Sequence, residues 1–156
     1  MFKDKKIVAF IPALALTLLS GCGQEQGTAE QKISTQLSTK CSLDAINGDG
    51  GLVVQTKTGK ADFRGWAVDS NTNTTPELLS VVLTSAEGVA FVFEGGQRFA
   101  RPGVVKVFKQ EAFLNSGFKL NADVSTLAKG TYSVSLQMPL ANSRVACKTN
   151  KTLLID

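Results

Sequence analysis

The chain of 156 residues contains no histidine, and its 3 cysteines, 1 tryptophan and 1 tyrosine leave few side chains for chemistry. Without histidine, Ser-His-Asp and Cys-His nucleophile arrangements and histidine-ligated zinc are excluded. No P-loop or GxSxG elbow occurs, and Gly95-Gly96 lacks the GxGxxG context of a dinucleotide site. Acidic side chains that a carboxylate pair would need are usually solvated at turns and strand edges. The sequence therefore predicts a protein that is not an enzyme and that holds no metal or other cofactor.

The chain also has no apolar run long enough to cross a membrane as a helix. Its main apolar run, Ile7 to Leu19, has 13 residues, whereas a bilayer core needs about 20. Lys3, Lys5 and Lys6 precede the run and small residues follow it, which is the three-part organisation of an export signal. We therefore expect residues 1–21 to be a removable signal peptide.

The segment Leu19-Ser20-Gly21-Cys22 closes the apolar run and resembles the lipobox of bacterial lipoproteins. The resemblance implies that the Cys22 thiol receives a diacylglycerol, that cleavage leaves Cys22 as the first residue, and that acylation of its amine can follow. More than one acyl chain gives lasting anchorage, because each buried methylene contributes about 0.8 kcal/mol. In Gram-negative lipoproteins an aspartate after this cysteine favours retention at the inner membrane. Gly23 stands there instead, which implies an outer-membrane protein facing the periplasm if the source is such a bacterium.

Positive charge is modest once the signal is removed. Loss of residues 1–21 takes away three lysines and Asp4, so the 17 basic and 13 acidic side chains fall to 14 and 12, a net charge of about +2. No basic tract interleaved with aromatics appears, so nucleic acid is not an expected partner.

The stretch from Cys22, the expected lipidation site, to Lys40 is rich in Gln, Thr and Ser. We expect residues 22–40 to be a flexible tether, with a short amphipathic helix through Ile33 and Leu37 as the alternative.

Two cysteines remain after Cys22 is assigned to lipid. In an exported protein the simplest interpretation of Cys41 and Cys147 is one disulfide that ties the first strand to the last. Closing so long a loop removes unfolded-state entropy worth up to about 4.7 kcal/mol. The alternative is two buried free cysteines, because Cys is among the most buried residue types. Metal binding is not supported, since two distant cysteines without histidine do not complete a tetrahedral site.

Residues 41–156 are predicted to form one domain made of short strands. β-branched and aromatic runs recur at spacings near ten residues between turn residues, which is typical of two packed antiparallel sheets of about seven or eight strands. Thr131 to Met138 alternates most clearly, with Tyr132 and every second residue after it apolar. A helical turn is expected only at Val124 to Ala128. The expected strands are 52–58, 62–69, 77–85, 89–93, 104–109, 117–122, 131–138 and 144–155, the last with a break at Asn150.

The segment Leu127-Ala128-Lys129-Gly130-Thr131-Tyr132 resembles the corner and following strand of immunoglobulin-like and fibronectin-III-like bacterial domains. The order Gly65-Trp66-Ala67-Val68-Asp69, Arg101-Pro102-Gly103-Val104 and Ser116-Gly117-Phe118 is similar to that of sandwich modules in secreted bacterial proteins. The resemblance implies an all-β, immunoglobulin-like sandwich in which Tyr132 hydrogen-bonds back to the corner. Such modules serve as spacers, adhesion elements or enzyme appendages, so the fold does not fix the function.

Candidate binding residues follow the Gly-Gly turn. Arg98 and Arg101 flank Phe99, with Lys106 beyond them, and two guanidiniums beside an aromatic ring are suited to carboxylates or phosphates of peptidoglycan, lipid A or a protein partner. The alternative is a charged hairpin that has no binding role and keeps the protein soluble. Trp66 is expected to anchor the core, with sugar stacking as the alternative.

Alternate oxygen-bearing residues at Asp69, Asn71 and Asn73 are similar to the start of a calcium loop, but Thr74 and Ser80 stand where glycine and the bidentate glutamate are required. We interpret this segment as a polar loop between strands.

Together the sequence patterns favour a non-enzymatic lipoprotein of the bacterial envelope, anchored by its lipid, whose sandwich binds an envelope protein or glycan or has a structural role. The alternative is a periplasmic inhibitor or a small-ligand or glycan binder, although Ser116-Gly117-Phe118 lacks the tyrosine of a Ser-Gly-x-x-Tyr inhibitory loop.

Overall fold

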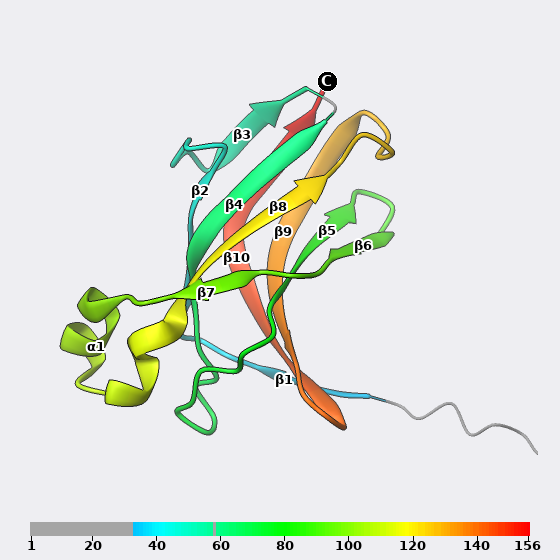
Figure 1. The fold of residues 1–156 in the computed structure, drawn as a ribbon. Helices are drawn as coiled ribbons and strands as arrows, with labels where there is room; N and C mark the ends of the chain where they lie inside the picture. Colours follow the sequence, from blue (N-terminus) through cyan, green and yellow to red (C-terminus); the bar gives the residue numbers. More distant parts are fainter. Residues whose placement is uncertain (1–32, 58) are drawn as a thin grey trace, which may run out of the picture. The chain divides into compact units, whose positions relative to one another are not determined.

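The computed structural model describes residues 33–57 and 59–156 (Figure 1). The expected signal peptide, the lipobox with Cys22 and most of the expected tether lie outside the described residues. The described part is mostly β-structure in two sheets, as the sequence predicts.

The first sheet follows the order β1-β10-β9-β5-β6, and β3 also pairs with β10. Pairing is antiparallel except for β1 and β3, which each run parallel to β10. Its strands are β1 (Ser34–Leu37), β3 (Val53–Thr56), β5 (Ser80–Ser85), β6 (Ala90–Phe93), β9 (Gly130–Pro139) and β10 (Ser143–Ile155).

The second sheet is antiparallel throughout and follows the order β2-β4-β8-β7. Its strands are β2 (Cys41–Ile46), β4 (Lys60–Ala67), β7 (Gln97–Phe99) and β8 (Gly117–Asp123). Between β7 and β8 the chain forms a helix, α1 (Pro102–Phe108), and a 3-10 segment, η1 (Glu111–Ser116). Both lie at the end of the sandwich away from the C-terminus (Figure 1).

The main core lies between the two sheets and is built by alternation along each strand. In β9 the predicted apolar face is buried, from Tyr132 to Met138, while Thr131 and Ser133 are exposed. In β4 the alternate residues Ala61, Phe63, Gly65 and Ala67 are buried in the same way. Because side chains of a strand alternate between faces, each sheet presents one apolar face inward.

The predicted disulfide between Cys41 and Cys147 is confirmed. It joins β2 of one sheet to β10 of the other, with Cα atoms 6.4 Å apart and a sequence separation of 106. The bridge therefore connects the two layers across the core. Of the two alternatives left by the sequence, the pair of free buried cysteines is excluded.

The expected strand at 104–109 is wrong. Residues 102–108 form α1, with Pro102 in its first turn and Lys109 closing it in the left-handed conformation at φ 51°. Proline is favoured at the first position of a helix, since its missing N–H is not needed there and its φ is already helical. Val104 is the one fully buried residue of this short run and Val105 is partly buried beside it, so the helix packs through one side and leaves the other exposed.

The described residues contain ten strands rather than seven or eight. Three of them were not expected as separate runs. Ser34–Leu37, placed in the tether by the sequence, form β1 beside the start of β10, where Ser34 aligns with Ser143. These four side chains are all exposed, so β1 is held by backbone pairing rather than by an apolar pattern that a sequence displays. The other two unexpected strands are β2 and the short β7.

The expected break at Asn150 is a bulge and not a strand end, because the register of β10 against β9 shifts between Lys148 and Thr152. The expected helical turn near 124–128 is a single turn, closed by a bond from the Leu127 N–H to the Val124 carbonyl. The predicted hydrogen bond of the tyrosine corner is present: Tyr132 Oη donates to the Ala128 carbonyl oxygen at 2.7 Å.

Candidate functional site

Arg98, the first candidate binding residue, is half-buried, and its guanidinium is bonded to the protein's own backbone. It aligns with the fully buried Phe118 on the inner side of β8. Its Nη1 donates to the carbonyl oxygens of Ala67 at 3.1 Å and Ser116 at 3.0 Å, and its Nη2 donates to that of Pro76 at 2.7 Å. A longer bond of 3.4 Å runs from Nε to the Glu77 carbonyl.

Burial lowers the pKa of Arg98 to about 10, so the guanidinium is still charged at neutral pH. With several N–H groups already bonded to carbonyls, this side chain ties together the ends of β4, η1 and the loop before β5. A guanidinium bonded in this way to the protein's own backbone has few donors left for a partner's carboxylate or phosphate.

Phe99 and Arg101 lie on the opposite, outer side of the second sheet. Phe99 is 40% exposed and aligns with Gly117 on β8. A Cβ atom at Gly117 would meet the Phe99 ring and the Cγ of Arg101 at 2.6 Å, so both side chains rest on the space that this glycine leaves open. Arg101 Nη2 reaches Asp44 Oδ2 at 2.8 Å. The two arginines of the motif therefore point to opposite faces, and only Arg101 remains beside Phe99.

Trp66 also lies on this outer face and not in the main core, so the expectation of a core anchor is corrected. It is half-buried and follows the inward-facing Gly65 on β4. Its ring packs 5.6 Å from that of Phe108 in α1, and Phe108 packs 5.9 Å from Phe113 in η1. Val68, Val104 and Phe113 are the buried members of this second apolar cluster. The helical insertion thus covers one end of the sheet's outer face with aromatic side chains.

Lys40 fixes the entering chain to this insertion. Its Nζ lies 5.4 Å from the centre of the Phe108 ring and 5.3 Å from that of Phe113, and it donates to Asn73 Oδ1 at 3.0 Å. A cation over an aromatic face contributes about 0.5–1 kcal/mol at an exposed site. The residue that precedes β2 is therefore held against α1 and η1.

These side chains form an exposed apolar surface that we call the platform. Val107 is 74% exposed and Phe108 37% exposed. A shallow hollow of about 260 Å³ opens beside them, lined by Trp66, Arg101, Gly103, Val104, Val107 and Phe108. The platform is defined by the five residues Trp66, Phe99, Arg101, Val107 and Phe108.

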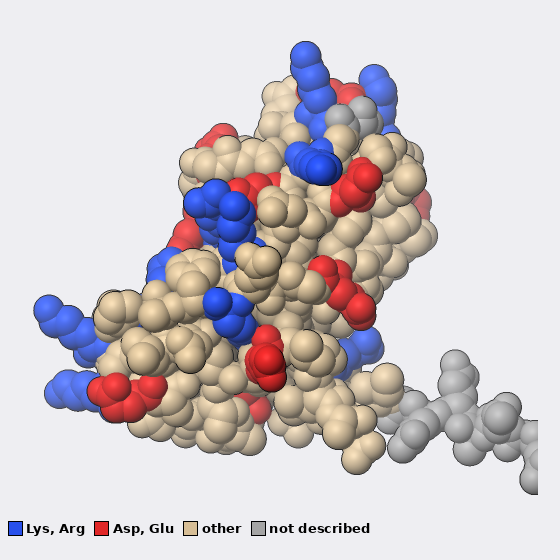
Figure 2. All heavy atoms as spheres, viewed as in Figure 1, with Lys and Arg blue, Asp and Glu red and all other residues tan. Residues whose placement is uncertain are grey.

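Basic side chains stand around the platform. Lys106, the last candidate binding residue, is exposed on α1, and Lys109 closes the helix. Lys and Arg atoms project over the part of the surface where α1 lies, with acidic atoms beside them (Figure 2). From Arg101 to Ser116 the chain has three basic residues and one acidic residue, Glu111. The arrangement is suited to an apolar or amphiphilic ligand that carries negative charge.

The loop that resembles the start of a calcium site is closed on itself. Asp69 is 1% exposed, and its Oδ1 accepts from the Asn71 N–H at 2.8 Å and from Asn71 Nδ2 at 3.0 Å. Its Oδ2 accepts from Thr72 Oγ1 at 2.7 Å. Burial acts to raise the pKa of Asp69, but these donated bonds outweigh it and lower the pKa below the usual value. Both carboxylate oxygens of Asp69 are thus hydrogen-bonded to residues of the same loop. Within residues 33–57 and 59–156, no three His, Cys, Asp or Glu side chains converge as a metal site would need.

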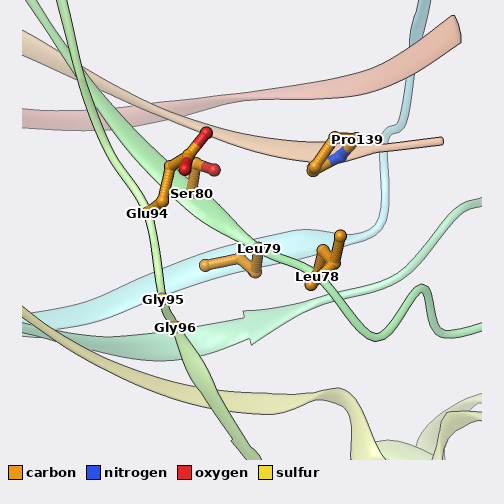
Figure 3. Close-up of a pocket in the computed structure, with 7 residues that line it drawn as sticks. All are labelled: Leu78, Leu79, Ser80, Glu94, Gly95, Gly96 and Pro139. Atoms are coloured by element: carbon orange, nitrogen blue, oxygen red, sulfur yellow. The ribbon is translucent and has the colours of Figure 1, made fainter. Parts of the chain in front are cut away.

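A second hollow, of about 180 Å³, lies where the chain crosses from β6 to β7 (Figure 3). Leu78 and Leu79 line it from the segment before β5, Gly95 and Gly96 from the crossover, and Pro139 from the end of β9. It is small, and no candidate residue of the sequence analysis lines it. Ser116, Gly117 and Phe118, compared above with an inhibitory loop, are all buried.

The structure brings Phe99 and Arg101 together with Trp66, places Lys106 nearby on α1, and separates Arg98 from them. Sequence reasoning missed Lys40, Val107 and Phe108, although Pro102 was a signal for the helix that presents the last two.

Neither helical segment among residues 33–57 and 59–156 has the length and apolar character of a membrane-spanning helix. No family model matches the chain, and no curated protein matches it.

Proposed function

We propose that the protein is a lipid-anchored, non-enzymatic lipoprotein of the bacterial envelope whose immunoglobulin-like sandwich contacts an envelope component through the platform. The observation that carries this proposal is the platform itself. An aromatic and aliphatic surface, with Val107 74% exposed, is presented on a domain whose two sheets are joined by a disulfide. Apolar side chains gathered into one exposed patch mark an interaction site, whereas apolar residues scattered singly over a surface do not.

Anchorage is supported by the sequence at the amino end. Three lysines, an apolar run and Leu19-Ser20-Gly21-Cys22 follow one another as in a lipoprotein signal. Acylation of Cys22 attaches the mature protein to a bilayer, and Gly23 favours the outer membrane, facing the periplasm, in a Gram-negative cell. The Cys41–Cys147 disulfide supports export, since such bonds persist in oxidising compartments and are rare in the cytosol.

The immunoglobulin-like assignment is supported by the corner before β9. Leu127 is buried, Gly130 has a positive φ of 152°, and Tyr132 bonds back to Ala128. These three features are those of the tyrosine corner in immunoglobulin-like sandwiches. The parallel pairing of β1 and β3 with β10 is an addition to the antiparallel pattern.

The anchor is tested with Cys22→Ser in the native host. We expect the variant to accumulate as an uncleaved precursor that lacks fatty acid and leaves the detergent phase on phase partitioning. Gly23→Asp is the matched control: it should keep its acyl chains and move to the inner membrane of a Gram-negative cell. Normal cleavage and membrane fractionation of Cys22→Ser would rule out the lipid anchor.

Contact through the platform is tested with a photoreactive residue placed at Val107, in intact cells. Leu52 is the matched control because it is apolar and 61% exposed, and it lies next to β3, away from α1 (Figure 1). We expect crosslinking to an envelope component from position 107 and not from position 52. Equal crosslinking from both positions, or none from position 107, would contradict the assignment of the platform.

A further inference from the structure

We propose that the envelope component in contact with the platform is the headgroup region of an anionic phospholipid bilayer, on which α1 rests with Val107 as its most deeply placed side chain. This inference rests on the lipid anchor of the proposed function. It names the partner of the same surface and gives the sandwich a defined orientation at the membrane.

The place where the chain enters the described domain favours a bilayer as the partner. Ile33 leads into β1, and both β1 and α1 lie at the end of the sandwich opposite the C-terminus (Figure 1). Lys40, which comes soon after β1, packs on the rings of Phe108 and Phe113. The end that carries α1 is therefore also the end at which the anchored segment joins the domain.

The length of the intervening chain keeps this end close to the anchor. Ten residues, 23–32, separate Cys22 from Ile33. Even if fully extended, a connection of this length reaches at most about 36 Å. An acylated Cys22 thus holds the β1 end within that distance of the bilayer, so contact by α1 becomes an intramolecular event with a high effective concentration.

The chemistry of α1 matches an anionic interface. Val107 is 74% exposed and Phe108 37% exposed, and they stand between Lys106 and Lys109 in the sequence. Aliphatic and aromatic side chains enter the boundary between headgroups and acyl chains, while lysines beside them meet lipid phosphates. Glu111 is the one acidic residue between Arg101 and Ser116, which leaves this stretch with net positive charge.

The same charges disfavour a second copy as the occupant. Symmetric association through the platform places identical surfaces face to face. The exposed lysines Lys106 and Lys109 of two copies would then approach each other, with Glu111 as the only acid of the helical insertion to offset them. Like charges brought together at an interface oppose association. A bilayer that carries phosphates meets no such repulsion.

The chain contains a built-in reporter for this contact, because Trp66 is its only tryptophan and packs on Phe108. The mature, acylated full chain is reconstituted into vesicles of phosphatidylethanolamine and phosphatidylglycerol, with or without bromine on the acyl chains. Bromine quenches tryptophan only at short range. We expect brominated vesicles to quench Trp66 emission in the wild type, and less strongly when phosphatidylglycerol is replaced by phosphatidylcholine.

Two variants and one matched control complete the experiment. Val107→Asp places a charge where the apolar contact is proposed, and the paired change Lys106→Gln with Lys109→Gln removes the basic side chains. Since a basic residue near an anionic surface contributes about 1 kcal/mol, the paired change should reduce the docked-to-undocked ratio about thirtyfold. Leu52→Asp is the matched control, because it makes the same kind of change at a residue that is 61% exposed away from the platform. Its Trp66 emission should be quenched by brominated vesicles as strongly as that of the wild type.

The outcomes separate this inference from the anchor. Flotation of the protein with the vesicles, combined with equal emission in brominated and ordinary lipid, overturns the membrane contact and leaves the anchor intact. If the protein carries no acyl chains and does not float with the vesicles, both the lipid anchor and the membrane contact are refuted. Self-crosslinking of Val107→Cys without bromine quenching would identify a second copy as the occupant, and crosslinking of the platform to an envelope protein without quenching would identify a protein partner. Either result refutes the bilayer assignment.

Discussion

Replacing Arg98 with methionine tests whether this half-buried guanidinium is a structural clamp. Three of its bonds to backbone carbonyls are between 2.7 and 3.1 Å long. Hydrogen bonds to a charged group contribute about 1.5–3 kcal/mol each, but bonds from a single side chain do not add fully, and methionine recovers some apolar packing. We therefore expect Arg98→Met to lower the free energy of unfolding by about 3 kcal/mol, equivalent to roughly 10 °C in Tm for a domain of this size.

The assay is unfolding of the oxidised protein in guanidinium chloride, followed by Trp66 fluorescence and far-ultraviolet circular dichroism. Arg64→Met is the matched control, because the Arg64 side chain is 53% exposed and bonds only to Asp62. An exposed ion pair contributes about 0–1 kcal/mol, so this control should change stability little. Equal losses in the two variants, or a loss below about 1 kcal/mol in Arg98→Met, would refute the clamp.

Two further predictions concern the disulfide and the polar loop. The paired change Cys41→Ser with Cys147→Ser should lower the free energy of unfolding by up to about 4.7 kcal/mol in chemical denaturation, because the long loop is then open in the unfolded chain; unchanged stability would contradict this. The Asp69 carboxyl has a lowered pKa in the folded protein, so its contribution is present above its unfolded pKa of about 3.9 and is lost as pH falls through the folded value. Thermal unfolding from pH 6 to pH 3 should therefore show a smaller acid loss in Asp69→Asn than in the wild type, and parallel curves would show that Asp69 does not contribute.

The parts of the fold that could be predicted from the sequence are those with a strong local pattern. Alternation from Tyr132 to Met138 placed β9 and its buried face. The pairing of Cys41 with Cys147 followed from the count of cysteines once Cys22 was assigned to lipid. Both inferences depend on residue type and spacing alone, which is why they did not require knowledge of the packing.

The helix α1 was misassigned because its apolar residues fit two periods. Val104, Val105, Val107 and Phe108 occur at the spacing of a helical face, but a short β-branched run is also typical of a strand. Pro102 distinguishes the helix from a strand, because proline is favoured in the first turn of a helix. The strand β1 was missed for a different reason: its four side chains are exposed, and its place is set by backbone pairing with β10.

The candidate binding residues were only partly predictable. The sequence placed Arg98, Phe99 and Arg101 together, but consecutive residues of a strand point to opposite faces, and the face that each takes depends on the register of β7 against β8. Trp66 faces outward for the same reason, beside the inward-facing Gly65 and Ala67. Val107 joins the platform, and Lys40 contacts Phe108 of the platform, only through tertiary packing, which no local pattern records.

The most direct test of the account is the intact mass of the native protein extracted from cell membranes under non-reducing conditions. We predict a polypeptide that begins at Cys22, carries at least two fatty acyl chains on that residue, and shows no free thiol on alkylation. A native chain that retains residues 1–21, lacks fatty acid and is recovered from the cytosol with reactive Cys41 and Cys147 would contradict the central claim.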